Sequence, residues 1–114
     1  MTTEGQEVPD RGDVVWVQFD PTRGHEQVGR RPALVISSRL YNSRSSLVVV
    51  CAMTGKRKRW TFTVPVKFRG RNAMVLVDQI RSIDREARVE SVAGRIGGDE
   101  LARVMGMLDA LLFQ

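Results

Sequence analysis

Residues 47–54, which read LVVVCAMT, are apolar on both faces of an extended chain, and this segment constrains the fold more than any other. A strand can bury both of its faces only where other parts of the protein cover it on both sides. We therefore predict that residues 47–54 form a central strand of a sheet.

Five other runs have the β-branched and aromatic composition of strands, at 13–20, 33–38, 60–66, 73–83 and 89–96. Pro65 interrupts one of them and favours an edge strand there, because proline lacks the amide that a central strand needs. Residues 39–46 are predicted to be a polar connection, and residues 84–88 a short helical turn. Most of the chain is therefore expected to be β structure.

A terminal helix is predicted after Gly97-Gly98, with Asp99 as its N-cap and Glu100 in its first turn. Its apolar residues recur at helical spacing on one face, and they are Leu101, Val104, Met105, Leu108, Leu111 and Leu112. Such a face needs a surface to cover. We predict an α+β, mainly β fold, in which a C-terminal helix covers a small, strongly bent sheet or partly open barrel.

The length of 114 residues suits a single domain spanning residues 1–114, of which the polar residues 1–11 are predicted to be flexible. Cys51 falls in the central apolar run and is interpreted as a core side chain. With one cysteine and one histidine, the chain has no ligand set for a structural zinc site, and we expect no metal and no cofactor. No run is long enough to span a membrane and no signal peptide opens the sequence, so we expect a cytoplasmic protein.

Positive charge is concentrated in the middle of the chain. Between Arg23 and Arg71, twelve Lys and Arg stand against Glu26 alone, so this segment carries +11. The remainder holds six arginines and twelve acids and carries −6, which together give the net charge of +5. A separation of this size favours a polyanionic partner, with nucleic acid as the leading candidate. A solvated basic surface is the alternative.

The segment 24–32, which reads GHEQVGRRP, is predicted to be a loop between two strands. It contains His25, Glu26, Arg30 and Arg31. An imidazole, a carboxylate and two guanidiniums within seven residues could form an acid–base site that faces a phosphate. The alternative is a charged hairpin tip.

Two further groups of reactive side chains lie where strands end. Thr54 closes the central run and is followed by Lys56, Arg57, Lys58 and Arg59. The run 73–83 turns polar at Asp78, Gln79, Arg81 and Ser82. Turns at one end of a barrel can converge, which makes these groups candidates for one site. Taken singly, each has a structural interpretation, namely a strand-capping hydroxyl, a solvated charge run and a carboxylate that locks a turn.

Three motifs occur together and in order, GDVVWVQFDP at 12–21, GHEQVGRRP at 24–32 and DQIRSID at 78–84. As a set they resemble the MazF/PemK family of toxin endoribonucleases, over nearly the whole chain. The resemblance implies a small SH3-like barrel of the CcdB/PemK type, a homodimer and a cognate MazE-like antitoxin. It also implies sequence-specific, metal-independent cleavage of single-stranded RNA (mRNA), which leaves 2′,3′-cyclic phosphate and 5′-hydroxyl ends.

The resemblance assigns roles to individual residues as well. The implied catalytic residues are Arg31, Thr54, Glu26 and His25, and the candidate substrate contacts are Arg30, Lys56, Arg57, Lys58, Arg59, Asp78, Gln79 and Arg81. One branch of the family has a catalytic arginine two residues before the aspartate, where this chain has Leu76. Arg31 therefore has to supply the guanidinium, and Asp78 is expected to shape the site.

The chemistry of RNA cleavage fits this inventory independently. RNA carries its own nucleophile, the 2′-hydroxyl, so the enzyme needs a base, a group that stabilises the phosphorane and a proton donor. Glu26 or His25 is the candidate base, and Arg31 or His25 is the candidate acid. Arg31, aided by Thr54, would stabilise the phosphorane. Because proline restricts the residue before it, Arg31 is expected to be held more rigidly than Arg30.

Two other functions stay open at this point. The CcdB toxin uses the same barrel to poison DNA gyrase through an aromatic residue near its C-terminus, and this chain ends in LLFQ at 111–114. A non-catalytic single-strand binder would stack bases on Trp60, Phe62 and Tyr41. The dense chemistry of residues 25–31 favours RNA cleavage over both.

Overall fold

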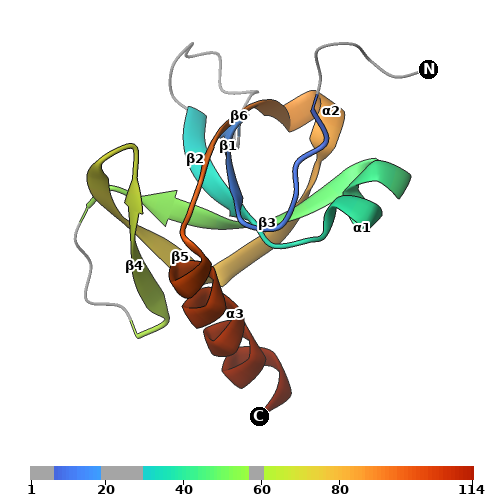
Figure 1. The fold of residues 1–114 in the computed structure, drawn as a ribbon. Coiled ribbons are helices and arrows are strands. Elements are labelled where there is room, and N and C mark those ends of the chain that lie inside the picture. The colour runs from blue at the N-terminus through green and yellow to red at the C-terminus, as the bar shows by residue number, and fades with distance from the viewer. Residues whose placement is uncertain (1–6, 19–29, 57–60) are drawn as a thin grey trace.

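The computed structural model describes residues 7–18, 30–56 and 61–114. Within them, six antiparallel strands form one sheet in the order β4-β5-β3-β2-β1-β6 (Figure 1). The strands are β1 (Asp13–Gln18), β2 (Arg30–Val35), β3 (Leu47–Thr54), β4 (Thr63–Phe68), β5 (Arg71–Asp84) and β6 (Val89–Arg95). Three helices accompany them, α1 (Arg39–Arg44), α2 (Arg85–Arg88) and the terminal α3 (Gly98–Phe113).

The predicted mainly β fold with a C-terminal helix is confirmed. Residues 47–54 form β3, which lies between β5 and β2 in the interior of the sheet. Pro65 lies on β4, which is an edge strand as its composition predicts. The helical turn expected at 84–88 is also present, because the side chain of Asp84 accepts a hydrogen bond from the Ala87 amide and caps α2.

Some predicted boundaries are wrong, because pairing partners decide where a strand ends. β2 begins at Arg30, so Pro32 lies inside the strand instead of opening it. Residues 39–44 form α1 and not an irregular connection, since Ser38 caps the first turn by accepting a hydrogen bond from the Tyr41 amide. β5 continues through its polar stretch to Asp84, because β3 pairs with both of its ends.

The N-cap of α3 is Gly97 and not the predicted Asp99. The carboxylate of Glu100 accepts a hydrogen bond from the Gly97 amide at 2.9 Å and another from the Lys67 amide at 2.8 Å. One side chain therefore closes the first turn of α3 and also fastens the helix to the edge strand β4. Amides at an exposed strand edge invite pairing with other chains, and Glu100 occupies one of them.

Two apolar clusters, one on each face of the sheet, make the core. The first joins the sheet to α3 through the buried side chains of Val104 and Leu108. The second lies on the opposite face and contains Val15, Val17, Ala33, Val35, Val48, Val50 and Ile83. The two strand faces of β1 thus serve different clusters, as the alternation of a strand requires. On α3, the predicted apolar face is buried in its middle, while Leu112 near the C-terminus is 54% exposed.

The sheet curls until its edge strands β4 and β6 approach each other. The ring of Phe68, at the end of β4, meets the ring of Trp16 edge to face, with 6.3 Å between the centroids. A Cβ at Gly94 on β6 would lie 3.2 Å from the Phe68 ring, so glycine leaves the space that this ring fills. Arg69 then donates from Nε to the carbonyl oxygen of Ala93 at 3.3 Å. These contacts close the partly open barrel that the sequence predicts.

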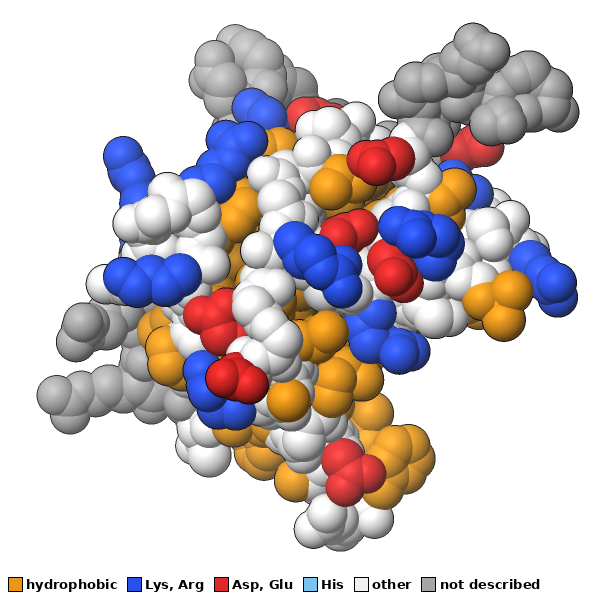
Figure 2. All heavy atoms as spheres, viewed as in Figure 1, with side chains coloured by type: hydrophobic (Ala, Val, Ile, Leu, Met, Phe, Trp, Pro, Cys, Tyr) orange, Lys and Arg blue, Asp and Glu red, His pale blue; other side chains and the backbone are white. Residues whose placement is uncertain are grey.

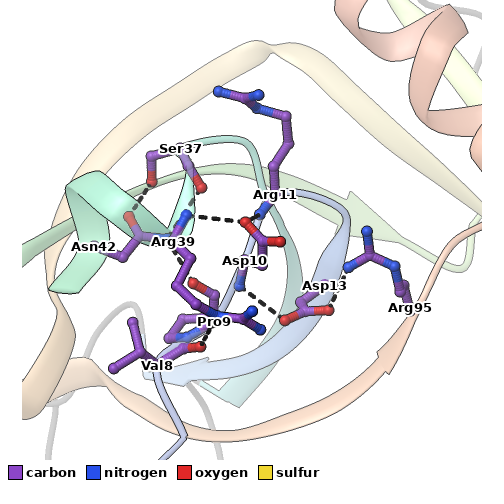
Figure 3. A network of polar contacts seen from close by, with 9 residues as sticks. All are labelled: Val8, Pro9, Asp10, Arg11, Asp13, Ser37, Arg39, Asn42 and Arg95. Atoms are coloured by element: carbon purple, nitrogen blue, oxygen red, sulfur yellow. Dashed lines mark hydrogen bonds and ion pairs between the residues drawn. The ribbon is translucent and has the colours of Figure 1, made fainter.

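A polar network fastens the chain before β1 to α1 (Figure 3). Asn42, which is fully buried, donates from Nδ2 to the carbonyl oxygens of Pro9 at 2.8 Å and Ser37 at 3.0 Å. Its Oδ1 accepts a hydrogen bond from the Ser37 hydroxyl. All polar groups of this buried amide side chain thus have partners, as a buried amide requires.

Asp10 extends the same network. Its carboxylate accepts hydrogen bonds from the amides of Arg39 and Arg11, and these bonds hold the pKa of Asp10 below its ordinary value. Asp13 accepts a hydrogen bond from the Asp10 amide and pairs with Arg95 at 2.8 Å. The prediction that residues 1–11 are flexible is therefore wrong for residues 8–11. Partners distant in the sequence hold this segment, and its composition does not reveal them.

In the described part of the chain, no helix combines the length and the apolar character needed to cross a membrane.

Candidate functional site

Arg31 and Thr54 lie at the same end of two neighbouring strands. β2 and β3 pair as Ala33 with Ala52, and continuing this register by two residues places Arg31 opposite Thr54. Residues two apart on a strand share a face, and so do residues that lie opposite each other. The guanidinium and the hydroxyl therefore belong to one face of the sheet, as the sequence analysis requires of a shared site.

The residues next to Arg31 and Thr54 on this face are the paired alanines Ala33 and Ala52, which have small side chains. Ala33 is fully buried and Ala52 is partly buried, whereas Arg31 is exposed and Thr54 is partly buried. Further along the same face, Val50 pairs with Arg81 of β5. Four residues separate Thr54 from Val50, so Arg81 lies about 13 Å along the strand direction. Arg81 and Arg31 are therefore two cations on one face that are well separated along the strands.

The hydroxyl of Thr54 caps the end of β3, as its position at the end of the central run predicts. Its hydroxyl oxygen accepts a hydrogen bond from the Lys56 amide at 3.1 Å and so stabilises the turn after β3. A hydroxyl that accepts one hydrogen bond still has its own proton to donate. Thr54 can therefore cap the strand and offer a hydrogen bond to a phosphate oxygen at the same time.

Asp78 and Gln79 lie in a bulge of β5 and not in a turn. Cys51 of β3 pairs with Ile80, but Met53 pairs with Val75, so the single residue Ala52 faces four residues of β5. Both Asp78 and Gln79 are exposed there. Bulges redirect side chains and are common beside active sites. The interpretation of Asp78 as a carboxylate that locks a turn is wrong, and the residue is instead presented by an irregular strand.

Cys51 is a core residue, as its place in the central run indicates. The thiol is fully buried and donates to the carbonyl oxygen of Val77 at 3.7 Å. Burial, together with the nearby carboxylate of Asp78, raises the pKa of Cys51 to about 12. The thiolate that a nucleophile requires is therefore negligible at neutral pH.

Arg30 is held more firmly than the sequence predicts. Its guanidinium carbon lies 4.5 Å from the centre of the Trp16 ring, and its Nε lies 3.0 Å from a carboxylate oxygen of Glu90. The expectation of a loosely held Arg30 is wrong, because these partners come from β1 and β6. Glu90 is a residue of this region that sequence reasoning missed. It reaches Arg30 across β1, because β1 lies between β2 and β6 in the sheet, and no motif marks it.

The remaining predicted site residues lie outside the described part of the chain. They are His25, Glu26, Arg57, Lys58 and Arg59. Gln18 and Arg30, the described residues on either side of the segment that carries His25 and Glu26, pair with each other at one end of the sheet. That end is the one where Arg31 and Thr54 lie.

A groove of about 580 Å³ lies between the β4–β5 hairpin, the end of β3 and α3. Apolar side chains from both hairpin strands line it, and they are Pro65, Val66, Ala73 and Met74. Three cations line it as well, Lys56, Lys67 and Arg103, against the single carboxylate of Glu100. The groove therefore combines an apolar floor with a net positive lining.

Basic side chains also gather near the candidate site on the surface of the molecule. Figure 2 shows Lys and Arg along the side of β2 and the β4–β5 hairpin, and a mixture of Lys, Arg, Asp and Glu over the middle of the face. Among the described residues, no three His, Cys, Asp or Glu side chains form a group that could hold a metal ion.

Comparison with known proteins identifies similar chains. A sequence profile of the family described as PemK-like, MazF-like toxin of type II toxin-antitoxin system matches residues 10–112. The endoribonuclease toxin MazF of Escherichia coli (strain K12) is 36% identical over 105 residues, which are 92% of this chain and 95% of that protein.

Solved structures agree with the sequence comparison. MazF (Form-I) from Deinococcus radiodurans is 40% identical and has a TM-score of 0.81, with 96% of this chain and 100% of that chain covered. A MazE-MazF structure (Form-II) from the same organism has a TM-score of 0.80 at 36% identity, with 96% of this chain and 99% of that chain covered.

Proposed function

Because this chain belongs to the PemK-like, MazF-like family and is an endoribonuclease toxin of a toxin–antitoxin system, we propose that its RNA-cleaving centre lies at the shared end of β2 and β3. The observation that carries this proposal is the β2–β3 register, which pairs Ala33 with Ala52 and, continued by two residues, would put Arg31 opposite Thr54 on one face. The described residues on either side of the segment with His25 and Glu26 pair with each other at the same end of the sheet. Relatives named as endoribonucleases favour RNA cleavage over gyrase poisoning and over simple RNA binding.

The proposed reaction is attack of the RNA 2′-hydroxyl on the adjacent phosphate. Glu26 or His25 removes the hydroxyl proton, and the new bond from O2′ to phosphorus gives a phosphorane with additional negative charge. Arg31 stabilises that charge with two parallel N–H donors, and Thr54 donates a third hydrogen bond. The bond from phosphorus to the 5′-oxygen then breaks, and this oxygen takes a proton from His25 or Arg31. The products are a 2′,3′-cyclic phosphate and a 5′-hydroxyl.

The rest of the basic surface would bind the single strand on either side of the cleaved bond. Arg81 is on the same face as Arg31 but at a distance that suits another phosphate. Lys56 lies two residues after Thr54 in the sequence, and Arg57, Lys58 and Arg59 follow it. We propose that these cations, with Asp78 and Gln79 on the bulge, hold the RNA and select its sequence.

Cleavage is expected to need no metal ion, since the RNA supplies the nucleophile and Arg31 supplies the charge. In excess EDTA, the purified protein should cut a long single-stranded RNA at its normal rate and leave cyclic-phosphate ends. Fragment-end analysis by mass spectrometry measures this. The Arg31→Ala protein, purified in parallel, controls for contaminating nuclease. A strict requirement for magnesium would contradict the proposed chemistry.

We also propose that the protein acts as a homodimer. Leu112 and Phe113 at the end of α3 are 54% and 77% exposed, and a second copy related by two-fold symmetry could cover them. Light scattering at micromolar concentration should give twice the mass of one chain. Replacing Leu112 and Phe113 together by serine should shift the protein toward monomer, whereas Ala110→Ser should not. A wild-type monomer at this concentration rules the dimer out.

The partner that restrains the toxin is proposed to be a MazE-like protein antitoxin. This follows from the family and from the MazE-MazF structures that the chain resembles. The groove beside α3, with its three cations and apolar lining, would suit an acidic antitoxin segment. Both an mRNA substrate and a protein antitoxin would be met in the bacterial cytoplasm, where we propose that the protein acts.

A further inference from the structure

The side chain of Arg30, the first residue of β2, contacts residues of two other strands. Its guanidinium lies over the ring of Trp16 on β1, and its Nε pairs with Glu90 on β6. Trp16 and Glu90 have further contacts of their own. Phe68 contacts the Trp16 ring from the edge, and Gln18 donates from Nε2 to the second carboxylate oxygen of Glu90 at 3.4 Å. The guanidinium is therefore pre-organised before any ligand arrives.

The geometry leaves one part of Arg30 for a ligand. One face of the guanidinium is toward Trp16 and its Nε edge is toward Glu90, yet half of the side chain remains exposed. A guanidinium that lies on one ring can accept a base on its opposite face. Proteins that read single-stranded RNA stack bases on such guanidinium planes as well as on aromatic rings.

We propose that Arg30 is a nucleobase platform, and that Trp16 and Glu90 are the residues that position it. The proposal rests on the endoribonuclease function and names how the site holds a nucleotide beside the cleaved bond. Arg30 and Arg31 are neighbours on β2, and their side chains leave the strand on opposite sides. An RNA strand that crosses the end of β2 can therefore place a phosphate on Arg31 and an adjacent base on Arg30.

The same contacts argue against Arg30 as a simple phosphate contact. The Glu90 carboxylate, 3.0 Å from Nε, already neutralises much of the charge on Arg30 and would repel a phosphate. A stacked base has no net charge and meets no such repulsion. Glu90 thus distinguishes the two roles, because removing its charge should strengthen a phosphate contact but loosen a stacking platform.

The test first maps where the protein cuts a long RNA, and then uses an eight-nucleotide RNA around that bond with a 2′-deoxy sugar at the cleaved nucleotide. Versions of this RNA that lack one base each are bound to wild-type protein, and fluorescence anisotropy measures the affinity. One missing base should weaken wild-type binding about tenfold. In Arg30→Ala and in Arg30→Lys, loss of the same base should not weaken binding further, because these variants lack the guanidinium on which the base would stack.

Two variants sharpen the result. Glu90→Gln should lower the penalty for the missing base without increasing affinity for the intact RNA. Arg44→Lys, on the distant helix α1, should keep the full tenfold penalty. The platform is refuted if Arg30→Lys still shows this penalty, or if Glu90→Gln binds intact RNA more tightly. Failure of wild-type protein to cut any RNA would instead refute the proposed function itself.

Discussion

Replacing Arg31 by alanine is expected to lower the rate of RNA cleavage by at least about 10²- to 10³-fold, the usual cost of removing one group that stabilises the charge of a transition state. Arg31 lies on β2, opposite Val17 of β1, and precedes Pro32. Strand pairing and the neighbouring proline both restrict its backbone, so the side chain leaves from a fixed base. Single-turnover cleavage at saturating enzyme measures the chemical step without a contribution from binding.

The conservative replacement Arg31→Lys should be severely impaired as well. An ammonium keeps the charge but cannot present two parallel donors to phosphate oxygens. The matched control is the adjacent Arg30→Ala, which should mainly weaken binding and leave the saturated single-turnover rate close to that of the wild type. Circular dichroism should show an unchanged fold in all three variants. If Arg31→Ala cuts at nearly the wild-type rate, the site assignment is wrong and the Asp78–Arg81 segment is the next candidate.

Replacing Asn42 by alanine should cost about 2–4 kcal/mol of unfolding free energy, because it leaves buried polar groups without partners. The side chain is fully buried and donates to the carbonyl oxygens of Pro9 and Ser37. Its loss also removes the acceptor of the Ser37 hydroxyl. Urea denaturation at a fixed protein concentration measures the change, and the concentration must be fixed because an assembled protein gains stability by mass action.

The control for Asn42 is Ser43→Ala, the neighbouring residue of the same helix. Ser43 is exposed, and its hydroxyl donates a hydrogen bond to the Leu40 carbonyl oxygen one turn earlier. Its replacement should change stability by less than about 0.5 kcal/mol. Below its melting temperature, the Asn42→Ala protein should still cleave RNA, in contrast to Arg31→Ala. A stability unchanged by Asn42→Ala would mean that the network of Figure 3 does not hold the N-terminal segment.

The strands were predictable where composition alone decides them. Residues 47–54 had to be central because both of their faces are apolar, and Pro65 marked an edge. Helix α1 could not be predicted because its sequence, RLYNSR, has no apolar periodicity. Its stability comes from the Ser38 cap and from Asn42, whose partner Pro9 lies 33 residues away. The N-terminal segment was misjudged for the same reason.

The sequence by itself indicates phosphate chemistry, since His25, Glu26, Arg30 and Arg31 lie within seven residues and their side chains are of the types that such chemistry uses. It also determined the class of fold, because hydrophobic alternation follows directly from which faces must avoid water.

Only the tertiary structure decided which side chains meet. The register of β2 on β3 sets which residues follow Ala33 and Ala52 on one face, and the strand order β2-β1-β6 brings Glu90 to an arginine sixty residues earlier. Shifting a strand by one residue would turn Arg31 to the other face, and no local pattern around it would change. Pairing between distant segments depends on the whole core, and that is why it cannot be read from any one stretch of the chain.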